Sequence, residues 1–397
     1  MRWLTSLLPF PSSGAFPSSG ASSYCRCDVS EQDQPETTQL VLAGLVSIVI
    51  TGARKSELMQ LGRQIGVQPD GDVKFARDPD LIVRFVNTLP GTTRPRPTTD
   101  GRGDSSDASA KMAGPGGSDI WLHFNDLGNP ACEVVCERGS GALPLITSIV
   151  RLLCLAKGVA PLHVTAFDFA GKRLIAGGWS GGGKTAALLA FLDRGASHIT
   201  SEWLLVDQGG ATVAALDHPI RIRRRHLVAG CKLATALPAL TRVRIGAIGA
   251  AASLLISAWP RSNPRLVRRL ASALEDRAFA DFAPPRNPTP VLGRPVDAVF
   301  LMSTGDHPTV KVHEADPLLV ADSLASALLF EHLALLPAYL QFRYASPTTP
   351  SSLVEGAHDR LRSVLRRVLS GTDAYIVERP RRCSLHLLGD RMAAALQ

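Results

Sequence analysis

Apolar and polar positions along the first part of the chain predict two strands and a helix. The apolar run at 40–52 predicts a buried strand, and the apolar spacing at 54–66 predicts a helix that a glycine ends. The apolar segment at 80–89 predicts a second strand. Residues 90–118 are so rich in Pro, Gly, Ser, Thr and Asp that they cannot build a core, so we expect a linker there.

The centre of the chain continues the alternation of strands and helices. We expect a strand at 119–124, a helix at 143–158 and two strands joined by a turn within 162–178. A helix over 186–195 and a strand at 201–207 follow. This order is typical of an α/β domain.

The C-terminal third is mainly helical by the same criteria. Apolar spacing predicts helices within 318–342 and over 358–369, then a strand at 374–380 and a short closing helix. Together the patterns predict an α/β fold with a mixed sheet, in which a smaller N-terminal α/β region precedes one large domain with helical C-terminal elements. The predicted divisions are a leader at 1–38, the N-terminal region at 39–89, the linker at 90–118 and the large domain at 119–397.

Composition is that of a globular protein, with 45% apolar and 20% charged residues. The longest apolar run, 40–50, is 11 residues long, whereas a membrane helix needs roughly 18 to 20, so no membrane association is expected. The N-terminus loosely imitates a secretory signal, but Pro9 and Pro11 interrupt it and a short repeat follows, which favours a disordered leader. Seven scattered cysteines fit a reducing compartment. We therefore expect a cytoplasmic protein.

Positive charge is concentrated in one stretch, which we call the basic segment (219–270). The chain carries a net charge of +8, and the basic segment holds eleven Arg and Lys and no acidic residue. Such a segment can bind an acidic partner, steer anionic ligands towards a nearby site, or form a solvated face. It matches no known nucleic-acid-binding motif, so nucleic acid is not the expected partner.

A glycine-rich loop is the most specific motif in the chain. Residues 178–185 fit the phosphate-binding pattern G-x-x-x-x-G-K-[ST] without a mismatch, between a predicted strand and a predicted helix. Converging backbone N–H groups, the helix dipole and Lys184 would bind the phosphates of ATP, and Thr185 can place its hydroxyl on Mg²⁺. Trp179 either covers this phosphate site or packs on a neighbouring strand. The predicted nucleotide-binding residues are Gly178, Trp179, Ser180, Gly181, Gly182, Gly183, Lys184 and Thr185.

A metal-binding carboxylate has two candidates in the strand that follows. Asp207 ends the apolar run "WLLVD", as the metal-holding aspartate of ordinary ATPases does, but only one helix separates it from Lys184. Glu202 stands at the start of the same strand. Because side chains alternate along a strand, the two carboxylates are expected on opposite faces, so at most one faces the metal.

The segment "LHVTAFDFAGKRLIAGGWSGGGKTAALLAFLDRGASHITSE" resembles the catalytic core of the HPr kinase/phosphorylase family. The chain is similar to what a divergent member of that family would be. In that family a histidine begins a strand, the glycine loop follows, and a helix ends in Arg-Gly before an acidic pair. Here His163 precedes Gly178 by fifteen positions, and the acidic pair falls on Ser201 and Glu202. The resemblance implies a phosphoenolpyruvate-carboxykinase type of P-loop domain.

The resemblance further implies an ATP-dependent kinase with Lys184, Glu202 and His163 as catalytic residues and Mg²⁺ held by Thr185 and Glu202. Ser201 replaces the family's catalytic base, and the later phosphorylase signature has no clear counterpart, so phosphorolysis is not expected. The acceptor is a hydroxyl of an unidentified protein, peptide or small molecule, acidic if the basic segment binds it. Relatives often assemble, which implies a homo-oligomer. Two alternatives stay open: an ATPase or nucleotide-dependent switch that binds an acidic partner, and a purely structural His163.

Overall fold

A computed structural model of the chain describes residues 37–67, 78–89, 109–113, 119–139, 143–216, 218–258, 274, 278–283, 293–332 and 335–397. The chain divides into two compact units, 1–34 and 35–397, and every described residue lies in the second. The predicted leader therefore lies outside the described residues except for its last two positions. None of the described helices is both long enough and apolar enough to cross a membrane.

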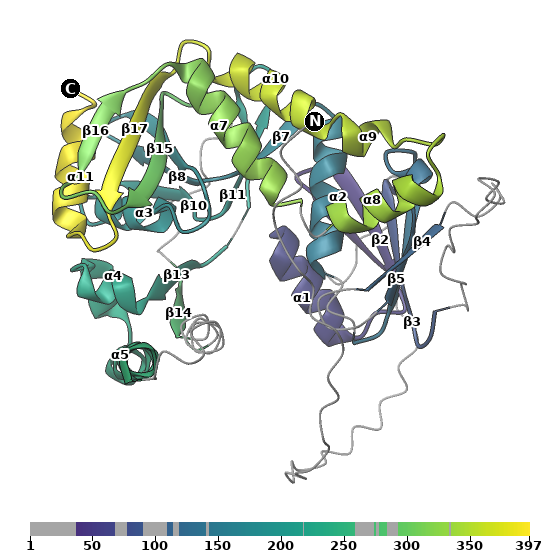
Figure 1. Cartoon of the computed structure of the whole chain (residues 1–397), viewed down its shortest axis with the longest axis horizontal. Coiled ribbons are helices and arrows are strands. Elements are labelled where there is room, and N and C mark those ends of the chain that lie inside the picture. The colour runs from purple at the N-terminus through teal and green to yellow at the C-terminus, as the bar shows by residue number, and fades with distance from the viewer. Residues whose placement is uncertain are drawn as a thin grey trace, which may run out of the picture. The chain divides into compact units, whose positions relative to one another are not determined.

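The N-terminal sheet has the strand order β1-β2-β3-β6-β5-β4 (Figure 1). Its strands are β1 (Thr38–Leu42), β2 (Val46–Thr51), β3 (Leu81–Val86), β4 (Ser109–Ala113), β5 (Asp119–His123) and β6 (Cys132–Glu137). The strands β2, β3 and β6 are parallel, whereas β1, β4 and β5 pair antiparallel with their neighbours. Helices α1 (Lys55–Ile65) and α2 (Leu143–Ala156) contact one another, and their apolar residues share a core with the sheet.

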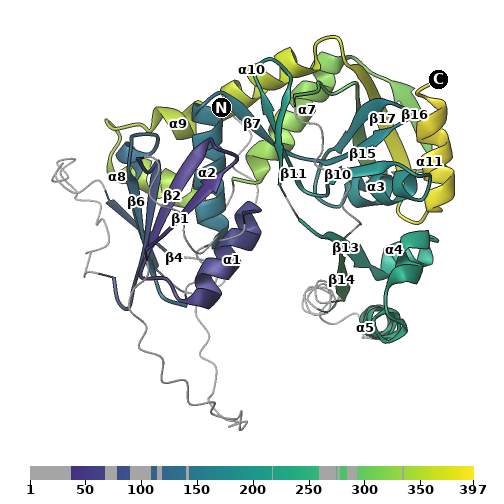
Figure 2. The same cartoon turned by 180° about the vertical axis from the view of Figure 1, so that it is seen from behind.

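A second sheet carries the glycine-rich loop and has the order β10-β8-β9-β15-β17-β16 (Figure 2). It is mixed: β9, β15 and β17 are parallel, and the remaining pairings are antiparallel. Its strands are β8 (Thr165–Phe169), β9 (Lys172–Gly177), β10 (Ser197–Thr200), β15 (Ala298–Gly305), β16 (Lys311–Glu314) and β17 (Asp373–Pro380). The predicted α/β fold with a mixed sheet is confirmed at this level.

Helices cover both faces of this second sheet. Along β15, Val299 packs in one apolar cluster with α7, whereas its neighbours Ala298 and Phe300 pack in another with α3 and α11, as the alternation of side chains along a strand requires. Helices α3 (Lys184–Leu192) and α11 (Leu385–Ala394) lie on one face and α7 (Pro317–Phe330) on the other, with α10 (Ala357–Leu369) packed against α7. Helices α8 (Leu336–Ala345) and α9 (Ser352–Glu355) belong beside the N-terminal sheet, where α8 contacts β4 and α9 contacts α2 (Figure 1).

Two smaller sheets complete the described structure. One has the order β12-β11-β7, from β7 (Val159–His163), β11 (Trp203–Asp207) and β12 (Thr212–Ala215), and the other pairs β13 (Ile220–Arg223) with β14 (Phe279–Phe282). The basic segment thus begins in β13 and continues through α4 (Arg224–Val228) and α5 (Ala239–Ala258). In the three-stranded sheet, Trp203 of β11 lies opposite His163 of β7. This pairing brings the two ends of the family-like segment, 162–202, close together.

Three predictions about the N-terminal half need correction. The run 40–52 is a hairpin rather than one strand, because Ala43 and Gly44 adopt positive φ (50° and 69°) and turn the chain between β1 and β2. The predicted linker contains the strand β4. The predicted boundary at 119 divides one sheet, since β5 and β6 pair with β4 and β3. One apolar core then runs from this sheet through α2 to β7, β11 and α7.

Candidate functional site

The glycine-rich loop connects the end of β9 to the start of α3, where the sequence predicted it. Gly178, Gly181 and Gly183 have φ of 129°, 80° and 110°, a region that residues with a Cβ rarely adopt. A Cβ at Gly178 or Gly182 would also lie 2.6 Å or 2.8 Å from the carbonyl oxygen of Met302 in β15. The loop is therefore built for glycine by both its backbone conformation and its close approach to a neighbouring strand.

Lys184 begins α3 and folds back over the loop. Its Nζ donates a hydrogen bond of 2.9 Å to the carbonyl oxygen of Gly178, and Thr304 Oγ1 donates one of 2.7 Å to the carbonyl of Gly182. Burial lowers the pKa of Lys184, while the negative charges of Glu331 and Glu202 act in the opposite direction. Two carboxylates, one of them predicted and one not, are thus the acidic groups that act on the loop lysine.

The tip of the loop is exposed. Trp179 is 50% exposed, and its ring centroid lies 4.4 Å from that of Phe330, at the end of α7. The ring that Trp179 contacts thus belongs to a helix, whereas the sequence analysis considered the phosphate site and a neighbouring strand. Ser180 and Gly181 are exposed beside it, and Thr185 is partly exposed in the first turn of α3.

The structure distinguishes the two candidate carboxylates in the next strand. Glu202 precedes β11 and lies 3.9 Å from both His218 Nε2 and Arg221 Nη1. Asp207 ends β11, and its Oδ1 accepts hydrogen bonds from the backbone of Gly209 and Ala211 at 2.8 Å and 2.9 Å. Since each strand residue advances about 3.3 Å, Asp207 lies far along β11 from the end that meets His163, and its oxygen stabilises a turn.

Ser201, at the position of the family's base, is buried and structural. Its Oγ donates to the carbonyl oxygens of His218 and Pro219, at 2.9 Å and 3.3 Å. The hydroxyl therefore fixes the segment that enters β13. Neither hydrogen bond gives the hydroxyl a basic partner, so Ser201 has nothing to activate it as a proton acceptor or a nucleophile.

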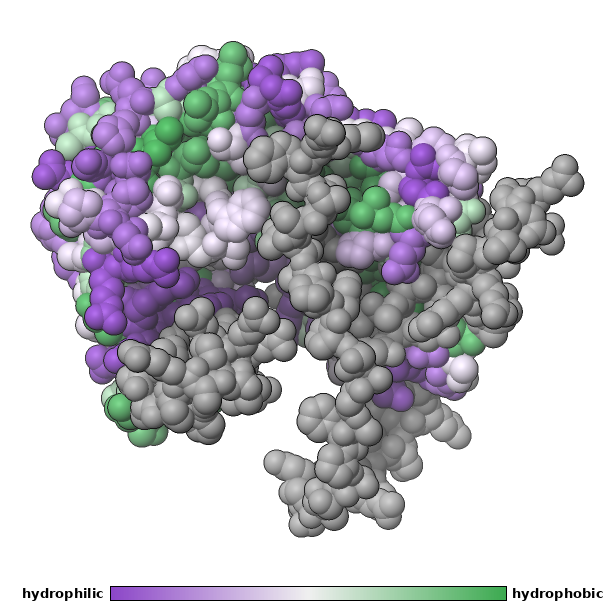
Figure 3. All heavy atoms as spheres, viewed as in Figure 1, coloured by the Kyte–Doolittle hydropathy of each residue, from purple (hydrophilic) through white to green (hydrophobic). Residues whose placement is uncertain are grey.

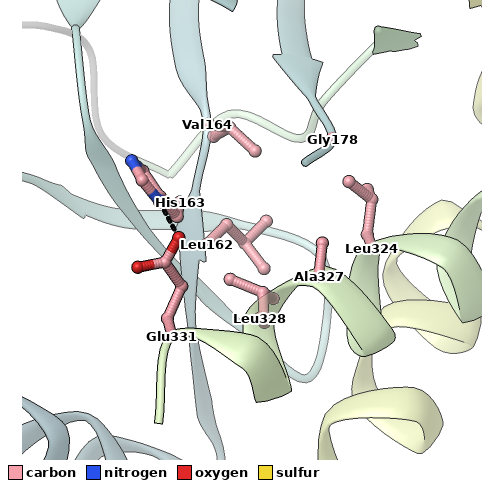
Figure 4. A pocket seen from close by; sticks show the side chains of 8 residues that line it. All are labelled: Leu162, His163, Val164, Gly178, Leu324, Ala327, Leu328 and Glu331. Atoms are coloured by element: carbon pink, nitrogen blue, oxygen red, sulfur yellow. Dashed lines mark hydrogen bonds and ion pairs between the residues drawn. The ribbon is translucent and has the colours of Figure 1, made fainter. Parts of the chain in front are cut away.

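His163 has a partner that the sequence analysis did not identify. Its Nδ1 lies 2.8 Å from Oε1 of Glu331, which directly follows α7 (Figure 4). The ring of His163 stacks on that of Trp203, with 4.8 Å between the ring centroids. Arg151 covers the same indole, with Cζ 3.6 Å from the centroid. Burial alone would raise the pKa of Glu331, but the hydrogen bond of His163, followed by the charges of His163, Arg151 and Lys184, lowers it. Glu331 is therefore an ionised carboxylate beside the loop.

A small cleft separates this pair from the glycine-rich loop. Figure 4 shows Gly178 on one side and Glu331 with His163 on the other, and apolar residues of α7, including Leu324 and Leu328, line the space between them. The enclosed cavity in this cleft has a volume of about 10 Å³, which is room for about one water molecule. The cleft is therefore too small to hold a nucleotide.

The other side of the loop is basic. Arg379, at the end of β17, is 9% exposed and lies against Gly183, where a Cβ would come within 2.7 Å of Nη1 of the arginine. Burial, then the charges of Arg225, Arg223 and Arg379, lowers the pKa of His226 to about 3. Arg379 therefore lies within electrostatic reach of His226, near the start of the basic segment. Figure 3 shows hydrophilic residues gathered on this face over β13 and α4.

Sequence reasoning missed three charged residues here: Arg151, Glu331 and Arg379. Each interrupts or ends an apolar run, in "ITSIVRLLCLA", "ALLFEHLALL" and "AYIVERP", and a charge in such a place is the signal that could have found them, because charged residues are rarely buried without a purpose. Glu331 and Arg379 come to the loop from elements that lie far from it in sequence, whereas Arg151 contacts Trp203.

Only a limited donor set is present for a metal. Among the described residues there is no group of three or more His, Cys, Asp or Glu that could hold one. Mg²⁺ in nucleotide sites commonly takes one or two protein oxygens together with phosphates and water, and Thr185 and Glu202 are donors of that kind. The residues present thus suit a metal carried by a nucleotide better than a resident metal centre.

Comparisons with known proteins do not add a family. Neither a scan against protein-family models nor a search of curated proteins finds a match for this chain.

Proposed function

We propose that the protein is an ATP-dependent phosphotransferase of the HPr-kinase-like type, built on a phosphoenolpyruvate-carboxykinase-type P-loop domain. The observation that carries the proposal is the half-buried Lys184 at the glycine-rich loop, acted on by the charges of Glu331 and Glu202. A loop that only bound an anion would gain nothing from two nearby carboxylates, because they repel the anion. A kinase needs carboxylates there, for metal binding and for proton removal.

The residues of the loop would bind and orient the nucleotide. Backbone N–H groups of 178–183 and the N-terminus of α3 attract the phosphates, and Lys184 exchanges its bond to Gly178 for the β- and γ-phosphate oxygens. Thr185 and Glu202 are the residues that would hold Mg²⁺, which, when bound, supplies neutralisation of the phosphate charge. Phosphoryl transfer then depends mainly on positioning and on this fixed electrostatic environment.

We assign to Glu331 the removal of the proton from the acceptor hydroxyl. In the transfer, the acceptor oxygen bonds to the γ-phosphorus, the bond from that phosphorus to the bridging oxygen breaks, and ADP leaves. The acceptor proton passes to a carboxylate, and Ser201 cannot take it. Glu331 faces the cleft beside the loop, and the hydrogen bond of His163 orients it, so His163 is a positioning residue in this scheme.

One observation favours a second function, a nucleotide-dependent switch that binds an acidic partner. Arg225 and Arg223, at the start of the basic segment, lower the pKa of His226, and so does Arg379, which lies against the loop. A change of nucleotide could therefore change their exposure to a partner. The kinase and the switch differ in the destination of the γ-phosphate.

The experiment that tests the proposal follows that phosphate. The purified protein is incubated with γ-labelled ATP and fractions of a lysate from its own cell, with Lys184→Ala as the inactive control and Asp207→Asn as the matched active control. The kinase reading expects label in a protein, peptide or small molecule, dependent on Lys184. Label that appears only as inorganic phosphate in every fraction contradicts it and favours the switch.

A further inference from the structure

Arg379 lies on the side of the glycine-rich loop where α3 begins, which is where the phosphates are expected to bind. It stands at the carboxyl end of β17, in register with Thr304 of the parallel strand β15, and Thr304 is hydrogen-bonded to the loop at Gly182. A Cβ at Gly183 would meet Nη1 and Cδ of Arg379 at 2.7 Å and 3.0 Å. The guanidinium thus lies at the first turn of α3, where the backbone N–H groups of the helix are not used within the helix.

The charge of Arg379 has no acidic partner among the described residues. The residue is 9% exposed, its Nε is buried without a hydrogen bond, and its Nη2 donates to the carbonyl oxygen of Arg381 at 3.5 Å. Arg225, Arg223 and Arg379 all act on His226 with positive charge. Burying a charge in such surroundings is costly unless an anion compensates it.

Arg173 provides the contrast within the same sheet. It is fully buried, and Nε and Nη2 donate to the two carboxylate oxygens of Asp168, each at 3.1 Å. This is the usual solution for a buried guanidinium, a fork that matches a carboxylate. Arg379 is buried to nearly the same extent but lies against a glycine-rich loop instead. The anion that would compensate the charge of Arg379 is therefore a ligand rather than a side chain.

We propose that Arg379 is a phosphate-binding residue that contacts the terminal phosphates of the bound nucleotide and stabilises the phosphoryl group during transfer. This inference rests on the proposed function. The guanidinium supplies in the same chain the charge that other phosphotransfer proteins take from an inserted arginine. Lys184 and Arg379 then hold the phosphates from two sides, the lysine from the acidic side of the loop and the arginine from the basic side.

The test compares Arg379→Gln and Arg379→Lys with Arg381→Gln, a matched control at the end of the same strand, whose arginine forms a 3.5 Å ion pair with Asp306 and has a side chain 77% exposed. Calorimetric titration measures the affinity for Mg-ATP and for inorganic pyrophosphate, which presents the same terminal phosphates without a nucleoside. Arg379→Gln should weaken both by about 10- to 100-fold, Arg379→Lys less, and Arg381→Gln not at all.

Thermal unfolding without ligand separates this role from a structural one. Because the buried charge of Arg379 has no acidic partner among the described residues, Arg379→Gln should unfold at the same temperature as the wild type or above it, a pattern typical of residues kept for function. A lower unfolding temperature in both Arg379 variants, or unchanged affinity for pyrophosphate, overturns the inference.

The two proposals fail in different ways. If the wild type binds pyrophosphate through Arg379 but does not bind ATP, the proposed function fails and the phosphate site remains. If the wild type binds ATP and Arg379→Gln binds it equally well, the inference fails alone. If the wild type binds neither, both are wrong.

Discussion

The part of the chain that the structure describes contains two sets of three parallel strands, and only one of these two sets carries a candidate site. In the N-terminal sheet, the carboxyl ends of β2, β3 and β6 are closed by their own polar groups. Arg138 donates from Nε to the carbonyl oxygen of Gly52 at 2.9 Å and from Nη1 to Asn87 Oδ1 at 3.1 Å. Glu137 accepts a 3.2 Å bond from the backbone of Leu89.

The corresponding ends of β9, β15 and β17 are not closed in this way. They carry a glycine-rich loop and two basic residues, Lys184 and Arg379. Among the described residues, the amine of Lys184 donates to a backbone carbonyl and Arg379 has no acidic partner. Ligands of open α/β sheets bind at the carboxyl ends of parallel strands, and both sheets offer such an edge. What distinguishes them is whether the polar groups at the edge already bind one another.

The largest expected effect concerns the lysine of the open edge. Lys184→Ala removes the charge directed at the β- and γ-phosphates, so affinity for Mg-ATP should fall about 100-fold or more. This loss corresponds to roughly 3 kcal/mol, the contribution of hydrogen bonds to a charged group. Calorimetric titration of the variant, with its fold checked by circular dichroism, measures this. An unchanged dissociation constant would mean that the loop is structural, like the edge of the N-terminal sheet.

A somewhat smaller loss is expected from the metal-binding carboxylate. Glu202→Gln should lower turnover about 100-fold, in the range of a lost electrostatic contact in phosphoryl transfer, with little change in ATP affinity. Asp207→Asn is the matched control, since the amide keeps the Oδ1 that accepts from Gly209 and Ala211. Steady-state rates with the acceptor found by labelling decide the matter, and greater damage in Asp207→Asn contradicts the assignment.

The loop itself could be predicted because its signal is local. Eight consecutive residues, 178–185, contain the glycines, the lysine and the hydroxyl that the chemistry needs, and the flanking apolar patterns place them between a strand and a helix. Most elements of the central part were equally local, such as the two strands that turn at Ala170 and Gly171, both with positive φ.

The rest of the site could not be predicted because it depends on distant pairing. Arg379 reaches the loop only because β17 pairs with β15, and Glu331 only because α7 packs over β7 and the loop. The edge of the N-terminal sheet was missed for a related reason: the composition of 90–118 conceals β4, and the pairing of β3 with β6 joins segments about fifty residues apart. A pattern along the chain carries no information about such pairings.

A third change tests whether the loop's close packing matters beyond its backbone conformation. Gly183→Ala should lower ATP affinity about tenfold, because the new Cβ displaces Arg379 and strains a residue at φ 110°. Gly139→Ala, next to the closed edge, is the matched control: it carries a similar φ of 77°, but nothing lies within 4 Å of its Cβ. Both variants should lose a comparable amount of stability in urea. Equal ATP affinities in the two variants would show that close packing at Gly183 does not matter for nucleotide binding.

The smallest effect on nucleotide binding, none at all, is expected at the closed edge. Arg138→Ala leaves the carbonyl of Gly52, in a buried residue, without its side-chain donor, which should cost about 1 to 3 kcal/mol of the free energy of unfolding. Urea unfolding measures that loss, and ATP titration of the same preparation should give the wild-type affinity. Arg379→Gln is expected to show the reverse pattern, weaker phosphate binding without lost stability. If Arg138→Ala instead weakens ATP binding while stability is kept, the two edges are coupled, and the N-terminal sheet belongs to the site rather than to its support.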